Sequence, residues 1–506
     1  MLRGKGNGGT LTKGGVASGA VWSGVNTLVT KLATIAVTVV VVRIVSPRDF
    51  GVFAVALVVY TVVSAFSELG LSVCIARRDL EPREMAPVVM ALSIASSVAL
   101  SASMIAAADP LAAFLGAPEA ASAVRVLSLS VLFSGLTTVP TALLTREFRQ
   151  GRIFVATAVA FVPSNVVLVI LALNGEGAMA FAWSRLTGQI VAGLAIIAMA
   201  RRWYWPRWNR GAARTALALG VPLAGANLLN YTLLNADYAF IGNLLGPALL
   251  GIYSLAFNVA SWSTSVLASA VNGVAMPAFS ELTGDPEGLR VALGRWLRVA
   301  GLVAFPVAAL SAVLAPDLVG VLYGDKWAGA APVLAILSVY GGLFILTLLA
   351  SNILVGTGRM GWVLGVQAIW LACLLLAVGL GVRTLGVIGA AYAHVGVIVL
   401  VILPVFMRAL RTVVPRPEAI AVRALRRPLA CALIAAGTTA AVGQLLPSGL
   451  LRLLGGGTVG VLVFVFTAWP AIVDSLPAAM ADRLGPLSAL GGSGGARRRS
   501  QFGGRS

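Results

Sequence analysis

The feature that most constrains this chain is the recurrence of apolar segments of about 20 residues along nearly its whole length. As a helix, each segment is long enough to cross a bilayer core of ~30 Å. Hydrophobic residues make up 59% of the chain and charged residues 11%, far from the composition of soluble domains. The sequence therefore predicts an all-α polytopic membrane protein.

The spacing of these segments predicts about fourteen transmembrane helices. We place them at residues 16–45, 50–75, 85–108, 122–145, 152–174, 178–200, 213–241, 247–277, 292–315, 330–356, 360–382, 386–410, 428–447 and 453–474. The first segment is too long for the core of a signal peptide and has no clean small-residue cleavage site. We therefore expect it to remain in the protein as a helix.

A repeated stretch indicates that the chain contains two related halves. RIVSPRDFGVFAVA (43–56) aligns without a gap with NLLGPALLGIYSLA (243–256), so that Pro47 meets Pro247 and Gly51 meets Gly251. Later in each half, Gly116 finds a counterpart in Gly324. Such a repeat predicts two pseudo-symmetric six-helix lobes around a central cavity, related by an axis along the membrane normal.

The predicted organisation therefore has five parts. These are a cytoplasmic tail (1–15), an N-terminal lobe (16–200), a C-terminal lobe (213–410), an extra helix pair (428–474) and a disordered cytoplasmic tail (475–506).

The distribution of positive charge predicts the orientation in the membrane. With the N-terminus in the cytoplasm, 29 of the 37 basic residues fall in cytoplasmic segments, and both termini are cytoplasmic. The net charge of +19 is thus spread over short loops, which argues against nucleic acid as a partner. The loop at 201–214 mixes Arg with Trp and Tyr, a pattern typical of anchoring at the lipid headgroups.

Several functional classes are excluded by what the chain contains. The three cysteines all fall in apolar runs and read as free thiols, and His394 is the one histidine, so we expect no disulfide framework and no metal site. The predicted loops are too short to form a catalytic domain. We therefore expect a protein that is not an enzyme and carries no cofactor.

The first predicted helix carries a polar stripe with a cation near its middle. Its members are Ser23, Thr27, Thr30, Lys31, Thr34 and Thr38. An ionisable residue inside the membrane is costly and is by default a functional candidate, so Lys31, Thr27 and Thr34 are candidates for binding substrate. The alternative is that the hydroxyls bond to their own helix and that Lys31 extends to the interface.

The first helix of the second half carries a stripe of its own. Its members are Asn227, Asn230, Tyr231, Asn235, Asp237 and Tyr238. Helix packing alone does not easily satisfy so many polar groups, so we expect Asn227, Asn230, Tyr231 and Asn235 to line the central cavity. Asp237 either forms an ion pair with Lys31 or Arg185 or carries a coupling proton.

Three further ionisable residues lie in predicted helices. Glu68 is a second candidate for ion coupling and Arg185 a candidate for substrate binding, although both are placed near predicted membrane edges. His394 is either a proton relay or a packed histidine in an Ala-rich helix.

Five motifs, in this order, resemble those of bacterial polysaccharide and O-antigen flippases of the Wzx type. They are VVRIVSPRDFGVFA (41–54), FSELGLSVCIARRDL (66–80), IGNLLGPALLGIYSLAFNVA (241–260), MPAFSEL (276–282) and LYGDKWAGAAPVLAILS (322–338). The resemblance extends over about residues 15–410. These flippases belong to the multidrug/oligosaccharidyl-lipid/polysaccharide exporter superfamily, and the last two predicted helices are consistent with its members that have fourteen helices. Where the family often has an Arg, this chain has Thr27, with Lys31 one turn later.

The resemblance implies movement of undecaprenyl-pyrophosphate-linked oligosaccharide across the bacterial plasma membrane for export of surface polysaccharide. It also implies a polysaccharide polymerase or export machinery as a partner. The energy source, a proton or a sodium gradient, stays open. Two alternatives within the superfamily are a lipid II flippase for peptidoglycan precursors and a multidrug/cation antiporter.

Overall fold

A computed structural model describes residues 33–67, 71–76, 81–200, 202–282 and 285–475. The chain is helical throughout these ranges, and they contain no strand. Ten helices in them are long and apolar enough to cross a membrane. The predicted all-α membrane fold is confirmed.

The first half of the chain forms a group of helices that we call the N-lobe. The first helix of the chain is described over Ala33–Ile44. The N-lobe helices are α2 (Pro47–Ser67), α3 (Leu71–Ala76), α4 (Pro82–Ala106), α5 (Ala108–Phe114), α6 (Ala120–Arg146), α7 (Gln150–Leu173) and α8 (Ala178–Met199).

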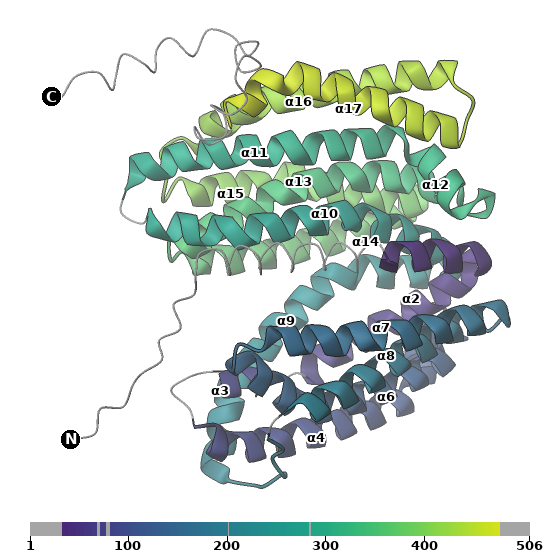
Figure 1. The fold of residues 1–506 in the computed structure, drawn as a ribbon, viewed down its shortest axis with the longest axis vertical. Helices are drawn as coiled ribbons and strands as arrows, with labels where there is room; N and C mark the ends of the chain where they lie inside the picture. Colours follow the sequence, from purple (N-terminus) through teal and green to yellow (C-terminus); the bar gives the residue numbers. More distant parts are fainter. Residues whose placement is uncertain (1–32, 68–70, 77–80, 201, 283–284, 476–506) are drawn as a thin grey trace, which may run out of the picture.

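The second half forms a second group, and Figure 1 shows the two groups one above the other. After α9 (Arg210–Leu245), the C-lobe contains α10 (Pro247–Glu281), α11 (Pro286–Val313), α12 (Ala315–Tyr323), η1 (Asp325–Trp327), α13 (Ala330–Gly356), α14 (Met360–Val397), η2 (Ile398–Ile402) and α15 (Leu403–Leu410). The pair α16 (Pro417–Leu445) and α17 (Leu450–Val473) packs on α11 at the outer side of the C-lobe.

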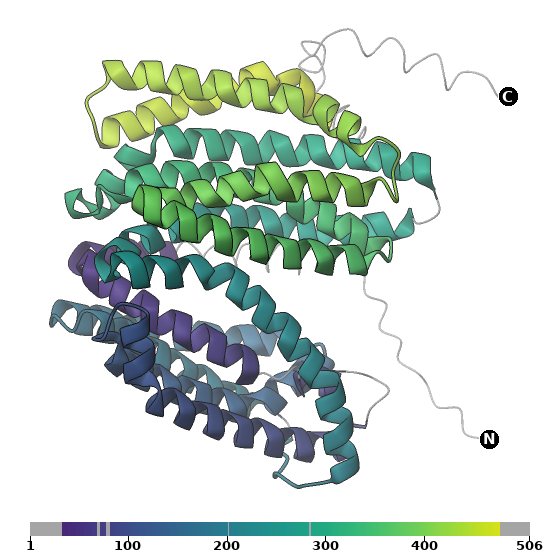
Figure 2. The same ribbon diagram turned by 180° about the vertical axis from the view of Figure 1, so that it is seen from behind.

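Helix α9 connects the two lobes. Its 36 residues run diagonally from the N-lobe to the C-lobe (Figure 2). Near its start, the carbonyl of Ala216 accepts a hydrogen bond from the thiol of Cys74 on α3, at 3.9 Å. Near its end, α9 packs on α10 and α14. The sequence assigns α9 to the second half of the chain, but the first turns of this helix pack against the N-lobe.

Helix α14 is a helical hairpin. Gly386 has φ +61° and ψ −141°, a conformation that residues with a side chain rarely adopt, and the chain reverses there. The two arms approach so closely that a Cβ added to Gly389 would lie 1.9 Å from the carbonyl oxygen of Gly381. The turn falls where the sequence places the boundary between helices 360–382 and 386–410, and the described helices are consistent with about fourteen crossings.

Helix starts follow ordinary chain chemistry. A proline lies within the first two residues of α4, α11 and α16, where its missing N–H is not needed. The side chain of Asn209 accepts hydrogen bonds from the N–H groups of Gly211 and Ala212 and so caps α9.

Two connections that the sequence treats as loops contain short helices. The segment 109–121 contains all of α5 except its first residue. The segment 316–331 contains all of α12 except its first residue, and it also contains η1. Seven and nine residues are too short for the sequence pattern to separate a helix from a loop, so the structure adds these elements to the prediction.

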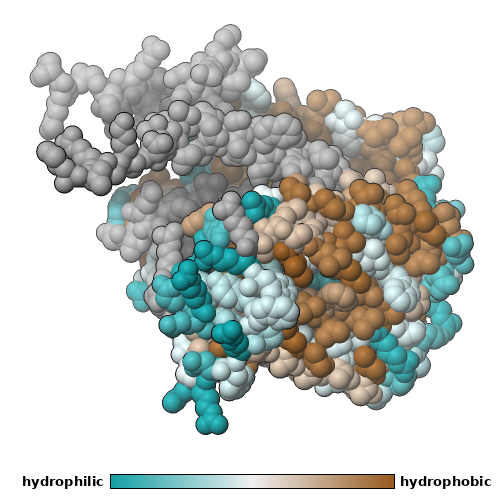
Figure 3. All heavy atoms as spheres, turned by 60° about the horizontal axis from the view of Figure 1, so that its bottom comes forward, coloured by the Kyte–Doolittle hydropathy of each residue, from teal (hydrophilic) through white to brown (hydrophobic). Residues whose placement is uncertain are grey.

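The outer surface matches an apolar environment. The side of α7 that faces away from the protein exposes Val155, Val159, Val162, Val166 and Ile170. In Figure 3, apolar side chains of the N-lobe form a broad brown area bordered by hydrophilic groups. Such an area is far larger than a soluble monomer exposes and matches contact with lipid tails.

Candidate functional site

The two copies of the repeated sequence touch each other. A Cβ added to Gly51 would lie 1.7 Å from the carbonyl oxygen of Pro247, and one added to Gly251 would lie 1.8 Å from that of Pro47. Only glycine allows this approach of α2 to α10, since any side chain would overlap the opposite backbone. The repeat therefore forms the contact between the lobes.

Two further contacts across the lobes join corresponding regions of the two halves through different residues. The carbonyl of Phe114, in the N-lobe, accepts a hydrogen bond from the side-chain amide of Asn243 at the end of α9. In return, the carbonyl of Val42, at the end of the first helix, accepts a hydrogen bond from the indole N–H of Trp327 at 3.0 Å. Each half thus binds the end of the first helix of the other half.

Cations strengthen this contact. The guanidinium of Arg43 donates to the carbonyls of Val321 and Leu322, the latter at 2.7 Å. Lys326 Nζ donates to the carbonyls of Arg43 and Val45 at 2.8 Å each. Partial burial lowers the pKa of Lys326, because desolvation disfavours its charge.

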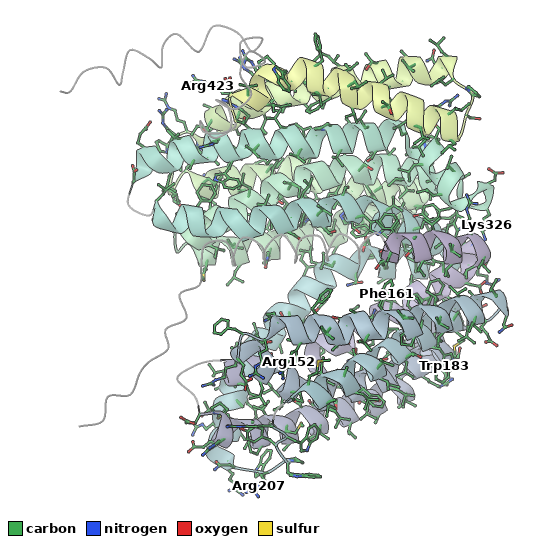
Figure 4. All side chains as sticks on the ribbon, viewed as in Figure 1. Arg152, Phe161, Trp183, Arg207, Lys326 and Arg423 are labelled. Atoms are coloured by element: carbon green, nitrogen blue, oxygen red, sulfur yellow. The ribbon has the colours of Figure 1, made fainter. Side chains whose placement is uncertain are left out.

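We call this contact region the junction. It comprises residues 42–51, 114–116, 242–251 and 321–327. Away from it the ribbons of the two lobes diverge (Figure 1), and Figure 4 shows Arg152, Arg207 and Arg423 at the opposite end of the molecule from Lys326. We call that opposite end the arginine-rich end.

The N-lobe contains a cavity of ≈ 530 Å³ between α2, α7 and α8. This volume falls in the range of small-molecule binding sites, about 300–1,000 Å³. Its aromatic lining comes from Phe53, Phe154, Phe161 and Phe181, and its polar lining from Thr157, Ser164, Ser184, Arg185 and Gln189. Figure 4 shows Phe161 on the side of α7 that faces the C-lobe.

Arg185 is the cation of this cavity. Its guanidinium carbon lies 4.5 Å from the centre of the Tyr60 ring, and Arg185 takes part in no ion pair among the described residues. The hydroxyl of Ser184 already donates to the carbonyl of Ser164, at 2.8 Å. The arrangement leaves a guanidinium, an amide and apolar ring faces for a ligand, the groups that suit an anion attached to a polar, ring-shaped molecule.

The structure places only part of the stripe on the first helix. Lys31 and Thr27 lie outside the described residues, as does Glu68. Thr34 is exposed, and its carbonyl accepts a hydrogen bond from the hydroxyl of Thr38 at 2.8 Å. At this position the hydroxyl of the stripe bonds to its own helix, as the alternative interpretation expects.

The stripe on α9 divides into two environments. Asn227, Tyr231 and Asn235 are half-buried, and the side-chain amide of Asn235 donates to the carbonyl of Tyr231 at 2.8 Å. The side chain of Asn230 lies outside the described part. Asp237 and Tyr238, in contrast, are buried inside the C-lobe. The stripe therefore does not face one common space, because α9 is covered by the C-lobe at its C-terminal end.

Asp237 is bound by residues that the sequence did not connect with it. Its Oδ2 accepts a hydrogen bond from the Tyr253 hydroxyl at 2.6 Å and lies 3.2 Å from His394 Nε2. Of the alternatives that the sequence left open for Asp237, a pair with Arg185 is not formed in this structure, since Arg185 lies in the other lobe. The alternative partner Lys31 lies outside the described residues, and the coupling proton stays a prediction. His394, which the sequence left open between a relay and a packed residue, is both packed and paired with a carboxylate.

Sequence reasoning missed most of the N-lobe cavity. Of its polar residues only Arg185 was a candidate, while Gln189 and the four phenylalanines went unnoticed. Gln189 follows Arg185 by four residues and so lies on the same face of α8, a spacing that could have indicated the pair. Phe154 and Phe161 lie on α7 and Phe181 on the following helix α8, but Phe53 comes from α2, so no local pattern connects all four.

Comparisons with known proteins agree with this architecture. The model of a family described as "Polysaccharide biosynthesis protein" matches residues 40–332, more than half of the chain. The succinoglycan biosynthesis transport protein ExoT of Rhizobium meliloti (strain 1021) is 27% identical over 84% of this chain and 87% of its own. The lipopolysaccharide biosynthesis protein WzxC of Escherichia coli (strain K12) is 26% identical over 64% of this chain and 66% of its own.

Solved structures show the same fold at low identity. The lipid II flippase MurJ in an inward closed conformation superposes with a TM-score of 0.74 at 13% identity, covering 88% of this chain and 98% of MurJ. An inward-facing multidrug transporter of the MATE family and the MOP superfamily gives 0.60 at 19% identity, covering 76% and 94%.

Proposed function

The chain belongs to the polysaccharide biosynthesis protein family, and from this premise we propose that it is a flippase for undecaprenyl-pyrophosphate-linked oligosaccharide repeat units. Its action would supply the outer face of the bacterial plasma membrane with precursors of a surface or extracellular polysaccharide. The similarity to ExoT, which is named as a transport protein of succinoglycan biosynthesis, supports a substrate of this class. The observation that carries the proposal is the N-lobe cavity around Arg185.

The cavity provides what the headgroup of such a lipid needs. A pyrophosphate and several sugar hydroxyls would lose many hydrogen bonds in hydrocarbon, each costing about 2–7 kcal/mol. The guanidinium of Arg185 can donate two parallel hydrogen bonds to a phosphate, and Gln189 can bind a hydroxyl. The phenylalanine rings offer flat apolar surfaces for the faces of sugar rings, while the prenyl chain stays in lipid.

Other predicted residues complete the binding site in this proposal. Lys31 and Thr27 would provide a second cationic region, and Asn227, Asn230, Tyr231 and Asn235 would bind sugar hydroxyls from α9. Thr34, which is exposed near the start of the described part of the first helix, would contribute its hydroxyl.

The lobes would act by alternating access. In this proposal the arginine-rich end faces the cytoplasm together with both termini, which the excess of Lys and Arg in these segments supports. The junction then closes the outer end, and transport requires it to open while the lobes approach at the cytoplasmic end. The delivered repeat units would pass to a polysaccharide polymerase or export machinery outside the membrane.

The proposal predicts that substrate builds up on the cytoplasmic side of the membrane when the protein is absent. In cells that lack this gene, lipid-linked oligosaccharide should accumulate in the cytoplasmic leaflet, and the surface polymer should be lost. The measurement is the leaflet distribution of the lipid-linked sugar, for example by its accessibility to an impermeant lectin or glycosidase. A normal distribution together with intact surface polymer would reject the proposal.

Arg185→Ala should abolish complementation of these cells at normal protein level, and Arg185→Lys should restore it only in part, because a lysine cannot bind a phosphate with two parallel bonds. Arg383→Ala is the matched control, since Arg383 is exposed at the turn of α14. Equal export by the Arg185→Ala and Arg383→Ala variants would remove the cavity from the proposal.

A further inference from the structure

A buried polar cluster lies inside the C-lobe, away from the N-lobe cavity. Asp237 on α9 is 0% exposed. Its Oδ1 accepts from the backbone N–H of Tyr238 at 3.0 Å, and its Oδ2 from the Tyr253 hydroxyl of α10 at 2.6 Å. His394 Nε2, on the second arm of α14, lies 3.2 Å from the same Oδ2. The cluster joins three helices through one carboxylate.

His394 has one ring nitrogen in use and one free. Because a carboxylate oxygen only accepts, Nε2 carries the hydrogen in this pair. Nδ1 is then an acceptor, and in a side chain that is 3% exposed it has no hydrogen-bond partner within the described parts of the chain. An unpaired buried nitrogen is unfavourable by about 1–3 kcal/mol. Its presence in a folded protein therefore indicates a position where another species binds.

A cavity lies next to His394. His394 lines a space of ≈ 120 Å³ between α9, α10, α13, α14 and α15, together with Ser351, Gln367 and Trp370. The indole N–H of Trp370 is likewise buried, with no partner among the residues that the structure describes. A cavity of this volume, with His394, Trp370, Ser351 and Gln367 in its lining, has room for water molecules, which occupy about 30 Å³ each in the liquid.

The ionisable groups that face His394 are few. They are Asp237 from α9, Tyr253 from α10 and Tyr340 from α13, whose ring centre lies 4.9 Å from that of His394. On α14, Arg383 and Tyr392 are exposed, and on α15 Arg408 is exposed while Phe406 faces the cavity. Among the described residues, the charge next to His394 is therefore that of Asp237, and no lysine or arginine pairs with this carboxylate.

The cluster lies directly behind the junction. Asp237 precedes Asn243 by six residues on α9, and Tyr253 follows Gly251 by two residues on α10. Both helices carry junction contacts at these ends, namely Asn243 with Phe114 and Gly251 with Pro47. A change in how α9, α10 and α14 hold together at the cluster therefore acts on the residues that close the outer end.

We propose that the Asp237–His394 pair is the proton-binding site that couples this transporter to a proton gradient. A proton enters through the cavity and binds Nδ1 of His394, so the pair changes from a net charge of −1 to an imidazolium–carboxylate pair of net charge 0. Histidine is the side chain whose ordinary titration lies between pH 5 and 8. Loss of the proton leaves a buried carboxylate held by hydrogen bonds alone, which weakens the packing of α9 on α14 and favours opening of the junction.

The inference rests on the proposed transport function, but it can be tested without substrate. His394 is the only histidine in the sequence, so protein purified with a histidine-free tag and labelled with ¹⁵N-histidine gives one set of imidazole signals. We expect these signals to change reversibly between pH 5 and 9, with the hydrogen of the neutral ring on Nε2. Signals that stay constant over this range would overturn the proposal.

Two aspartate variants distinguish the effect of the Asp237–His394 pair from the effect of removing any buried carboxylate. Asp237→Asn should lower the protonated fraction of the histidine by about tenfold at a fixed pH above the transition, because the stabilising charge is gone. Asp317→Asn should leave the titration unchanged, since Asp317 is buried on α12 and binds the backbone N–H of Gly449. The same titration in both variants would contradict the proposed pairing.

A second measurement tests the link to the junction. Spin labels at Arg207 and Arg359, in a chain with Cys74, Cys373 and Cys431 replaced by Ala, report the distance between the lobes at the arginine-rich end. The distance distribution should differ between pH 6 and pH 8, and His394→Gln should abolish the difference. A pH response that persists in His394→Gln, or a response to sodium at fixed pH in its place, would overturn proton coupling.

These results are independent of the flippase assignment. If the substrate class is wrong, the titration and the distance change should remain while Arg185→Ala has no effect on polysaccharide. If the coupling is wrong, His394 should not respond while Arg185→Ala still abolishes export.

Discussion

Asp237 shows how one residue depends on its partners. A buried carboxylate without a neighbouring lysine or arginine is stable only when its oxygens accept hydrogen bonds, and here Tyr238, Tyr253 and His394 approach them. Of these three contacts, the hydrogen bond from the Tyr253 hydroxyl is the shortest, at 2.6 Å. At the residue scale, the stability of the C-lobe and the proposed proton site thus rest on the same atoms.

Tyr253→Phe should destabilise the protein by about 1–3 kcal/mol, because one oxygen of a buried carboxylate loses a donor while the ring packing stays. The measurement is the midpoint of thermal unfolding in detergent. Tyr392→Phe is the control, since Tyr392 is 54% exposed and should leave the midpoint unchanged. An equally small effect of both substitutions would mean that the Tyr253 hydroxyl does not stabilise Asp237.

At the scale of elements, the crossing of α2 and α10 decides how the lobes meet. Pro47 and Pro247 begin these helices, and the glycines four residues later let each helix touch the backbone at the start of the other. Because both copies of the repeat contribute equally, the contact is nearly two-fold symmetric. A symmetric contact at the pseudo-axis suits a hinge about which the lobes rotate.

Gly51→Ala should open the junction, since its Cβ would lie 1.7 Å from the carbonyl oxygen of Pro247 and the helices must separate. We expect reduced export and faster reaction of a cysteine at Ser46 with an impermeant thiol reagent in the cysteine-free chain. Gly361→Ala is the matched control, since a Cβ there meets no atom within 4 Å. Unchanged reactivity in Gly51→Ala would show that the junction does not close this end.

At the scale of the whole molecule, the proposed alternating access requires the closed junction to be temporary. Each half binds the first helix of the other half, so opening breaks these contacts in pairs rather than one at a time. In the part of the chain that the structure describes, the two lobes are joined through the junction and by α9. The alternating access that we propose would then be a change in the angle between lobes that themselves change little.

Fixing the junction should therefore stop export. Cysteines at Phe114 and Asn243, bridged by a short cleavable reagent, should abolish polysaccharide export, and reduction of the bridge should restore it. The control pair is Asp109 and Arg125, which form an ion pair at 2.6 Å within the N-lobe, so bridging them should not affect export. Export that continues with the junction bridged would exclude alternating access through this end.

The sequence by itself determined the features that depend on local composition and pattern. Apolar length predicts membrane helices because a buried backbone must bond within its own segment. The match between 43–56 and 243–256 predicted the duplication, and the motifs predicted the family to which the chain belongs. The sequence also singled out Arg185 and Asp237, because an ionisable group in an apolar helix is exceptional at any position.

Only the tertiary structure decided which of these groups meet. Asp237 and His394 are 157 positions apart, and they pair because α9 and the second arm of α14 pack side by side in the C-lobe. Gly51 and Gly251 align in sequence, but alignment does not imply contact, which follows from the pseudo-axis passing between them. Such pairings depend on the angles and registers of helices, which result from the packing of the whole chain and are not encoded in any single segment.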